Sequence, residues 1–393
     1  MNIQETIERA LKSAGLNTQS GPLRGVTDTI RNALASAGLV VGAAATPAQA
    51  AAPGDDTIDV VAREVPTPGS DTADAAPAGG QFVLRSFTAP AGTRVYKLYV
   101  PAQATGAQMP KTAKTTTAGA LPLVVMLHGC TQSADDFAAG TQMNRLADEH
   151  GFLVVYPEQA SGANASRCWN WFRAEDQQRG AGEPALLAAL VQSVVAEHPV
   201  DPGRVYVAGL SAGAAMAVIL GETYPELFAA VGAHSGLPYA AAHDIPSAMA
   251  AMKGRGVMGM GHLPGTPDDP RRPARQAVPV IVFHGDRDHT VQHSNGEHIA
   301  QQAASAHAAS PHGLHASTEQ GQVPSGRHYT RTRHTNAQGR CLVESWTLHG
   351  AGHAWSGGDA SGSFTDRDGP NASAEMLRFF LAQPKNTRNP NAR

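Results

Sequence analysis

The chain has little of what marks disulfide scaffolds, metalloproteins, nucleic-acid binders or membrane proteins. Its 393 residues include only 3 cysteines; an odd number leaves at least one thiol unpaired within a monomer. No C-x-x-C pair occurs, and no two histidines at helical spacing flank a glutamate, so we expect neither a metal nor a cofactor. A net charge of -3 gives no basic surface for nucleic acid. No apolar run is long enough to span a membrane.

What the sequence does have is a composition suited to a large buried core. Hydrophobic residues make up 42% of the chain and charged residues 16%, which favours one α/β domain with an appended segment. Strand-like and helix-like stretches alternate over residues 81–383, and this alternation is typical of a mostly parallel sheet with helices on both faces. The expected strands are 81–87, 94–100, 121–127, 153–156, 205–208, 230–234, 278–283 and 342–348, and the expected helices are 134–150, 182–197, 212–224, 292–309 and 371–381.

The most informative motif is the run GLSAG at residues 209–213. It follows the strand-like stretch 204–208 and opens an alanine-rich helical stretch. A G-x-S-x-G turn between a strand and a helix holds its serine on a tight bend, where small neighbours leave the hydroxyl exposed. The free N–H groups of the following helix point at the same place. This context predicts that Ser211 is a nucleophile.

Candidate partners for Ser211 follow two later strands. The strand 278–283 runs into a loop with Asp286 and Asp288, and the strand 342–348 runs into a glycine-rich loop with His349 and His353. Serine attacks, imidazole carries the proton, and a carboxylate fixes the imidazole tautomer. We favour Asp288 over Asp286 as the acid. Asp286 follows the strand directly, and an aspartate in that position is common for turn chemistry alone. We favour His353 because His349 still lies at the strand end.

An oxyanion hole is expected at the turn after the strand 121–127, where the sequence reads HGCTQ. A loop after an early strand supplies one amide to such a site, and the residue after the nucleophile supplies the other. We therefore assign the two donors to the backbone amides of Cys130 and Ala212. A disulfide between Cys130 and Cys168 is possible, but the spacing does not decide it.

Together these motifs resemble the polyhydroxybutyrate depolymerase family of serine esterases, which is related to feruloyl and acetylxylan esterases. The resemblance covers about residues 80–383 and implies an α/β-hydrolase fold with a triad of Ser211, Asp288 and His353 and an oxyanion donor at Cys130. The motifs that carry it are HGCTQ at 128–132, CWNWF at 168–172, GLSAG at 209–213, HG at 284–285 with Asp288 and Val291, and GAGHAW at 350–355.

Aromatic residues admit two interpretations for the substrate site. The run 168–172 groups Trp169 and Asn170 with further aromatics; clustered aromatics are more often core. The resemblance instead implies that Trp169 and Asn170 contact substrate. Trp355 is a further candidate because it lies two residues from His353. The methionine-rich stretch 246–273 is interpreted either as a flexible rim or lid or as a plain surface insertion. Residues 310–322 are interpreted as a solvated loop.

These observations predict a serine carboxylic-ester hydrolase that works through an acyl-enzyme intermediate. The resemblance implies short-chain polyhydroxyalkanoate, such as polyhydroxybutyrate, or its oligomers as the substrate, with feruloyl or acetylxylan esters as the alternative. A hypothesis of another class is a non-catalytic, granule-associated scaffold. The three triad residue types in three loops argue against it, since a scaffold does not require them.

The N-terminal segment carries a repeat. Residues 6–16 and 29–39 share the same apolar positions and end in Ala-Gly-Leu, which indicates a repeated amphipathic helix over residues 1–50. Such short helices need a docking partner, and a polymer granule surface is one candidate. The alternative is an export signal ending in Ala-Gln-Ala at 48–50. We expect a cytoplasmic or granule-associated protein on the first reading and an exported one on the second. Residues 51–80 are expected to be a flexible linker and 384–393 a disordered tail.

Overall fold

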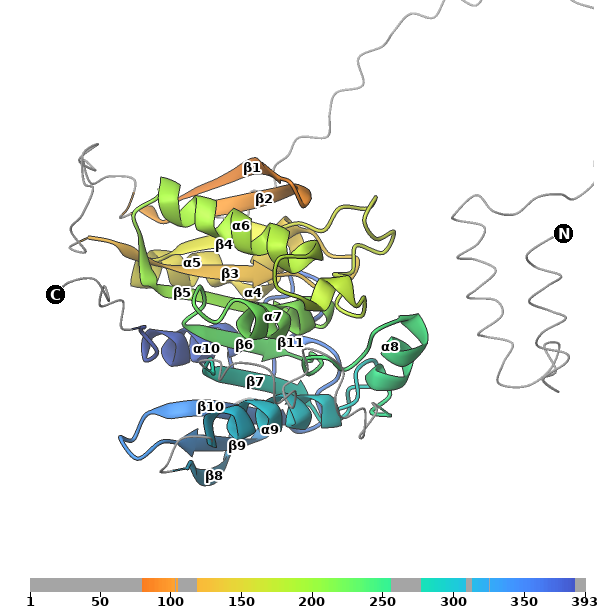
Figure 1. Cartoon of the computed structure of the whole chain (residues 1–393). Coiled ribbons are helices and arrows are strands. Elements are labelled where there is room, and N and C mark those ends of the chain that lie inside the picture. The colour runs from red at the N-terminus through yellow and green to blue at the C-terminus, as the bar shows by residue number, and fades with distance from the viewer. Residues whose placement is uncertain are drawn as a thin grey trace, which may run out of the picture. The chain divides into compact units, whose positions relative to one another are not determined.

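A ten-stranded sheet organises the part of the chain that the computed structural model describes, which is residues 80–102, 104, 119–255, 277–308, 313–324 and 326–385 (Figure 1). The strand order is β1-β2-β4-β3-β5-β6-β7-β10-β9-β8. The expectations for residues 1–50, for nearly all of the linker and for the tail from 386 onward lie outside these residues. The strands are β1 (Gln81–Ala89), β2 (Gly92–Val100), β3 (Leu121–Leu127), β4 (Leu153–Pro157), β5 (Val200–Leu210), β6 (Ala230–His234), β7 (Val280–Gly285), β8 (His315–Gln322), β9 (His328–Thr335) and β10 (Cys341–Leu348), and a separate small sheet pairs β11 (Trp355–Ser356) with β12 (Thr365–Asp366).

The centre of the large sheet is parallel. The run β4-β3-β5-β6-β7-β10 pairs in parallel throughout. Antiparallel strands extend it at both ends, with β2 and β1 beyond β4, and β9 and β8 beyond β10. Because parallel strands all end at the same edge, the loops after β3, β5, β7 and β10 meet there. This edge is where the sequence places its candidate residues.

Helices cover both faces of the sheet, as Figure 1 shows for α6, α7 and α9 on one side and α10 on the other. The two faces follow from alternation along β5, where Val205 and Val207 enter one core cluster and Tyr206 and Ala208 enter the other. The predicted mostly parallel sheet with helices on both faces is confirmed. The helices are α4 (Ala134–Thr141), α5 (Met143–His150), α6 (Gly182–Glu197), α7 (Ala212–Thr223), α8 (Ile245–Met252), α9 (Ser294–Ala308) and α10 (Ala372–Leu381), with a short 3₁₀ turn at Glu175–Gln177.

Several elements differ from the sequence expectation, and β9, β11 and β12 are strands that it did not include. The helix expected over 134–150 is two helices, because Gln142 adopts a left-handed conformation with φ of 55° between them. Residues 315–322, expected to be a solvated loop, form β8, which pairs with β9. The start of the methionine-rich stretch forms α8, whose first turn is closed by a reciprocal capping box between Asp244 and Ser247. The rest of that stretch, from residue 256, lies outside the described residues.

No helix in the described ranges combines the length and the apolar character needed to cross a membrane.

Candidate active site

Ser211 occupies the bend between β5 and α7. Its φ of 58° and ψ of -119° are unusual for a residue with a side chain, and such strain is maintained only where the surroundings enforce it. The Ser211 amide donates to the His234 carbonyl at 2.9 Å. Ser211 stands at the N-cap position of α7, yet its side chain makes no capping hydrogen bond. The hydroxyl is therefore not used to satisfy the helix.

The two glycines of the motif have no room for a side chain. A Cβ built on Gly213 would lie 2.1 Å from the Leu127 carbonyl oxygen, and one on Gly209 would lie 2.4 Å from the Gly213 carbonyl carbon. The start of α7 is thus pressed against the end of β3. This close packing sets the bend that carries Ser211.

Asp288 and His353 are hydrogen-bonded to each other at this edge of the sheet. The His353 Nδ1 lies 2.7 Å from the Asp288 Oδ2, while the other carboxylate oxygen accepts the amides of Thr290 and Val291, both at 2.9 Å. Asp288 is buried. Burial alone raises the pKa of Asp288, but the interactions with His284, with His353 and with the backbone outweigh it and hold the pKa below its ordinary value. The residue is an ionised carboxylate that orients an imidazole.

The alternative residues of the two loops also pair. The His349 Nδ1 lies 2.9 Å from the Asp286 Oδ2, and the side chains of this pair are 41% and 34% exposed, against 13% and 0% for His353 and Asp288. The structure therefore brings the favoured acid together with the favoured base and the two remaining candidates together with each other.

The loop after β3 leaves one amide unused. The Gly129 amide donates to the Gln132 Oε1 at 2.9 Å, and the Thr131 amide donates to the Ser166 carbonyl at 2.7 Å. The Gln132 amide donates to the Gly129 carbonyl. Among the described residues, the Cys130 amide between them has no hydrogen-bond acceptor.

This loop lies directly beside the serine. A Cβ built on Gly129 would be 3.7 Å from the Ser211 Cβ. Ala212 is the first residue of α7, and the first amides of a helix have no partner within it. The structure thus places the expected oxyanion donors, Cys130 and Ala212, on the loop and the helix start that adjoin Ser211.

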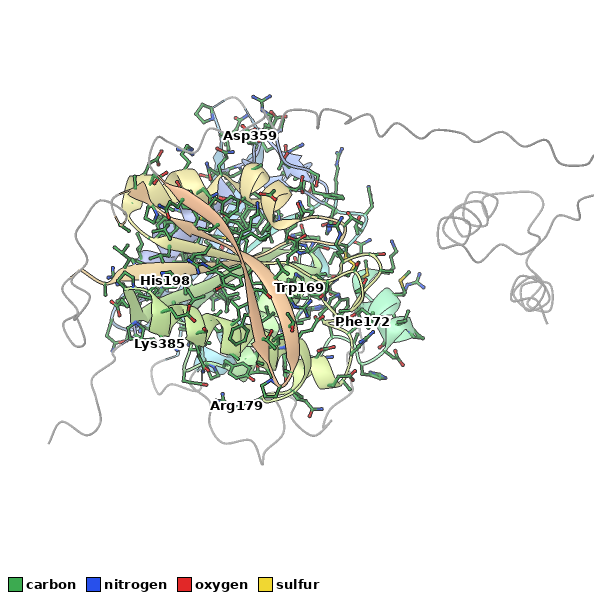
Figure 2. The ribbon with its side chains drawn as sticks, turned by 90° about the horizontal axis from the view of Figure 1, so that it is seen from above. Trp169, Phe172, Arg179, His198, Asp359 and Lys385 are labelled. Carbon is green, nitrogen blue, oxygen red and sulfur yellow. A yellow bond between two sulfur atoms is a disulfide. The ribbon has the colours of Figure 1, made fainter. Side chains whose placement is uncertain are left out.

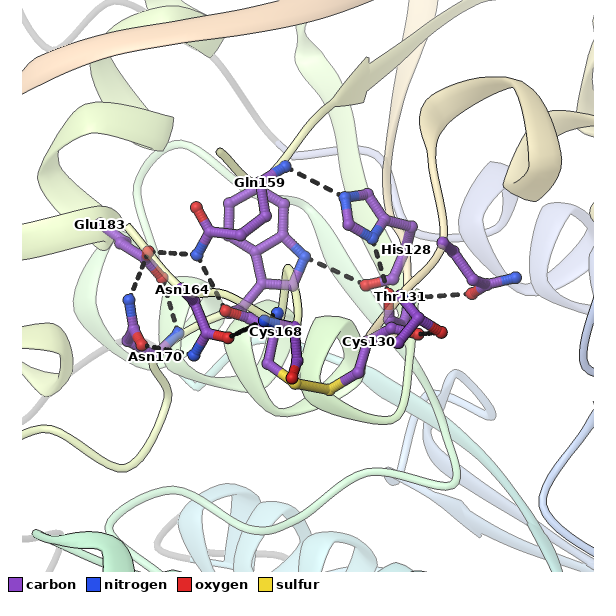
Figure 3. The surroundings of a disulfide bond; sticks show 12 residues. His128, Cys130, Thr131, Gln159, Asn164, Cys168, Asn170 and Glu183 are labelled. Atoms are coloured by element: carbon purple, nitrogen blue, oxygen red, sulfur yellow. Dashed lines mark hydrogen bonds between the residues drawn. A yellow bond between two sulfur atoms is a disulfide. The ribbon is translucent and has the colours of Figure 1, made fainter. Parts of the chain in front are cut away.

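A buried network holds the loop in place (Figure 3). Cys130 and Cys168 form a disulfide, which joins the loop to the segment after β4. The Trp169 Nε1 donates to the His128 carbonyl at 3.0 Å, and the Gln159 amide donates to the His128 Nε2 at 3.0 Å. Burial lowers the pKa of His128 to about 4, so its imidazole is neutral. Its Nδ1 then donates to the Gly129 carbonyl at 2.7 Å.

The residues expected to contact substrate lie in the interior. Trp169, Asn170 and Trp355 are 0%, 2% and 1% exposed. The Asn170 side chain donates to Glu183 at 2.9 Å, and the Trp355 Nε1 donates to Ser373 at 3.0 Å. The expectation of substrate contact does not fit this burial, because these polar atoms are already satisfied within the protein. The alternative interpretation of the aromatics as core fits it.

His234, which lies in none of the motifs named above, connects the serine to the histidine loop. Its carbonyl accepts the Ser211 amide, and its Nε2 accepts the Ser356 amide at 3.0 Å. The Trp355 ring stacks on it with 5.2 Å between centroids. Burial, together with the nearby His284 and His353, lowers the pKa of His234 to about 3. A repeated signal could have found it, since a histidine stands within one residue of the end of each of β3, β6, β7 and β10.

An open groove of about 750 Å³ lies next to this loop system. Phe172 and Ile245 contribute apolar surface to it, and in Figure 2 Phe172 lies toward α8 while Trp169, on the same segment, lies within the fold. Ser166 lines this groove, and its carbonyl accepts a hydrogen bond from the Thr131 amide, so the groove adjoins the loop of Cys130. Within the described ranges, no group of three or more His, Cys, Asp or Glu side chains is placed to hold a metal ion.

Comparison with known proteins gives curated relatives that are named as depolymerases and esterases. The chain is 35% identical over 237 residues to poly(3-hydroxyalkanoate) depolymerase C of Paucimonas lemoignei, a match that covers 59% of this chain and 54% of that protein. It is 37% identical over 119 residues to feruloyl esterase B of Neurospora crassa, covering 30% of this chain and 40% of that protein. The chain thus spans about half the length of these curated relatives or less.

A solved structure shows the fold. The acetyl xylan esterase from Aspergillus awamori matches with a TM-score of 0.56 at 19% identity, covering 76% of this chain and 99% of that chain. The expected α/β-hydrolase fold is confirmed by this match together with the sheet described above.

The family model described as "Esterase PHB depolymerase" matches residues 96–308. This range includes Cys130, Ser211 and Asp288 and ends before His353. It covers more than half of the chain, and it confirms the resemblance seen in the motifs. The chain belongs to the esterase PHB depolymerase family.

Proposed function

We propose that this protein hydrolyses carboxylic esters through a covalent acyl intermediate on Ser211. The observation that carries the proposal is the hydrogen-bonded pair of Asp288 and His353 at the edge of the sheet where Ser211 stands on its strained bend. His353 takes the serine proton as Ser211 attacks the ester carbonyl and returns it to the leaving alcohol. Asp288 holds the imidazole in the tautomer that accepts this proton and stabilises the imidazolium.

The negative charge on the attacked carbonyl oxygen needs donors that are already oriented. The unused amide of Cys130 and the helix-start amide of Ala212 supply them in our proposal. The loss of one such donor typically lowers turnover about a hundredfold to a thousandfold. Water, activated by His353, then attacks the acyl-enzyme and releases the acid, which regenerates Ser211.

For the substrate we propose short-chain polyhydroxyalkanoate or its oligomers. Two observations support this class: the similarity to a poly(3-hydroxyalkanoate) depolymerase, and an open groove with apolar side chains at Phe172 and Ile245 beside the Cys130 loop. An extended chain of ester units fits an open groove better than an enclosed pocket does. Feruloyl and acetylxylan esters remain the second candidate, because relatives with those names match as well.

Replacement of Ser211 by alanine tests the reaction. We expect Ser211→Ala to lower kcat on a soluble short-chain ester by at least about a thousandfold, because the nucleophile is lost. Ser86→Ala is the matched control, since Ser86 is exposed on β1 at the far end of the sheet. Equal rates for wild type and Ser211→Ala would contradict the proposal and favour the non-catalytic scaffold.

A substrate panel tests the class. We expect the wild type to act faster on amorphous polyhydroxybutyrate and hydroxybutyrate oligomers than on methyl ferulate or acetylated xylan. The reverse order would move the proposal to the second candidate. The same granules, sedimented with the full chain and with a chain that lacks residues 1–50, test the interpretation of that segment as a granule-docking helix pair against its interpretation as an export signal. Docking predicts that the shortened chain remains in solution while it still hydrolyses the soluble ester.

A further inference from the structure

The loops that carry the proposed acid and base are joined by a second, outer acid–base pair. Asp286 and His349 each lie on the same loop as one member of the inner pair, Asp288 or His353, and nearer to its strand. Both carboxylates accept from an imidazole Nδ1, at 2.9 Å for the outer pair and 2.7 Å for the inner pair. The outer pair is therefore built like the inner one but faces solvent.

The Asp286 carboxylate joins the two loops at a second point. Its Oδ1 accepts the Gly350 amide at 2.7 Å while its Oδ2 faces His349. Two backbone hydrogen bonds also connect the loops. The Asp286 amide donates to the Leu348 carbonyl at 3.1 Å, and the Arg287 amide donates to the Ala351 carbonyl at 3.0 Å. The two loops thus approach each other through a carboxylate with both oxygens engaged.

The approach of the two loops is close enough to exclude any side chain at Gly285. A Cβ built there would lie 2.3 Å from the Ala351 carbonyl oxygen and 2.7 Å from that of Gly352. Gly350 has a φ of 73°, which is suited to glycine. The segment that leads to His353 therefore takes its path from its contact with the Asp286 loop.

Contacts on the other side complete the support of the histidine loop. The Thr330 hydroxyl on β9 lies 2.9 Å from the His349 Nε2. The Arg327 Nη1 donates to the Gly350 carbonyl at 2.9 Å, and Arg327 is ion-paired with Asp366. His349 thus spans from β9 to Asp286 with both ring nitrogens engaged.

We propose that Asp286 and His349 are positioning residues that fix the His353 loop against the Asp288 loop. This inference rests on the proposed function. His349 is four residues from His353 along one loop, and Asp286 is two residues from Asp288 along the other. A shift of the outer contact therefore displaces His353 relative to Asp288. A misplacement of about 1 Å is enough to cost roughly a hundredfold in rate. An exposed pair contributes little to the free energy of unfolding. We therefore expect loss of the outer pair to lower turnover and to leave stability nearly unchanged.

The conservative variants separate the hydrogen bonds from the charge. In Asp286→Asn the amide oxygen can still accept the Gly350 amide, and the amide nitrogen can donate to His349 once the imidazole takes its other tautomer. In His349→Asn the side-chain nitrogen stands near the place of Nδ1 and can still donate to Asp286. The alanine variants Asp286→Ala and His349→Ala lose these bonds.

The test measures kcat, KM and the thermal midpoint of the full chain on a soluble short-chain ester. We expect each alanine variant to lower kcat roughly tenfold to a hundredfold, with KM within about twofold and a thermal midpoint close to wild type. Each asparagine variant should recover most of the lost turnover. Glu149→Ala, which removes a similarly exposed ion pair with Arg145 on α5, is the matched control.

A second background shows that the pair acts through His353. In a His353→Ala chain, Asp286→Ala should cause no further loss of the residual rate. Wild-type turnover in Asp286→Ala would overturn the inference, and so would an equal loss of rate with and without His353. The proposed function would still stand in either case if the wild-type activity depends on Ser211. A wild type that hydrolyses no ester would overturn both.

Discussion

At the scale of a single residue, Trp169 packs against the loop that we assign to the oxyanion hole. Its ring is fully buried, and its Nε1 binds the carbonyl of His128, the residue that begins the Cys130 loop. The ring of Trp169 also lies 5.5 Å from that of His128 between centroids. Trp169 therefore supports the Cys130 loop from the protein interior.

Replacement of Trp169 by phenylalanine separates support from substrate contact. The change keeps an aromatic ring and leaves the buried His128 carbonyl without its donor, which costs about 1 to 3 kcal/mol in the free energy of unfolding. We expect a lower kcat and an unchanged KM for a soluble ester. Trp346→Phe is the control, because it also removes one buried Nε1 hydrogen bond, to Glu344, but on β10. A higher KM with unchanged stability would instead favour the substrate contact that the sequence suggests.

Much of the candidate site can be predicted from the sequence at this scale, since it depends on residue types that follow strands. Ser211 is expected from its motif, and the loops that carry the acid and the base are expected from their order along the chain. Position relative to the strand end then favours Asp288 and His353, which the structure places side by side. The role of His234 could not be predicted, because it depends on which carbonyl and which amide happen to meet it in space. The burial of Asn170 likewise depends on Glu183, which lies on another element.

Among the secondary-structure elements, apolar strands were predictable and polar ones were not. β3 and β7 are buried along nearly their whole length, and their hydrophobic runs indicate this directly. β8 reads HASTEQGQ and is mostly exposed at the end of the sheet, so it has no apolar alternation to detect. The break at Gln142 escaped prediction because the residue with the left-handed conformation is a glutamine, while the nearby Gly140 lies inside the last turn of α4.

The disulfide couples two of the loops at the sheet edge. Cys130 and Cys168 are separated by 38 residues, and closure of such a loop contributes about 2 to 4 kcal/mol to stability. We expect Cys168→Ala to lose this stability and also to lower kcat, because Cys130 is the residue whose amide we assign to the oxyanion. Cys341→Ala, at the free cysteine, is the control. Full turnover in Cys168→Ala would show that the loop keeps its position without the bridge.

The same bridge bears on the compartment. Disulfides form and persist in oxidising environments and are rare in the cytosol. We therefore propose that the protein acts outside the cytoplasm, which favours the export alternative for the N-terminal segment. Counting free thiols in the chain isolated from its native cells tests this. One free thiol supports the proposal, and three contradict it.

At the scale of the whole molecule, buried neutral histidines link stability to pH. The pKa of His128 is lowered to about 4 and that of His234 to about 3, in both cases chiefly by burial. In the unfolded chain these histidines titrate near 6.5, so between pH 6.5 and 4 the unfolded state binds more protons. Their contribution to stability is complete above pH 6.5 and declines as the pH falls. Asp176, whose pKa burial raises to about 6, acts in the opposite direction.

A thermal unfolding series from pH 7 to pH 4 measures this effect. We expect the free energy of unfolding of the wild type to fall by more than about 2 kcal/mol over this range. His234→Gln, whose amide oxygen can still accept the Ser356 amide, should be less stable at pH 7 but should have a flatter pH profile. His315→Gln, at an exposed position on β8, should keep the wild-type slope. An unchanged slope in His234→Gln would refute the linkage.

The histidines at the strand ends also change how mutational data on this chain are to be interpreted. A histidine scan for inactive variants will detect His128 and His234 as well as His353, since collapse of a supporting loop and loss of a proton carrier give the same phenotype. Chemical rescue distinguishes them. Imidazole supplied from solution can replace a missing proton carrier at a site open to substrate, but it cannot restore a ring that is packed inside the sheet.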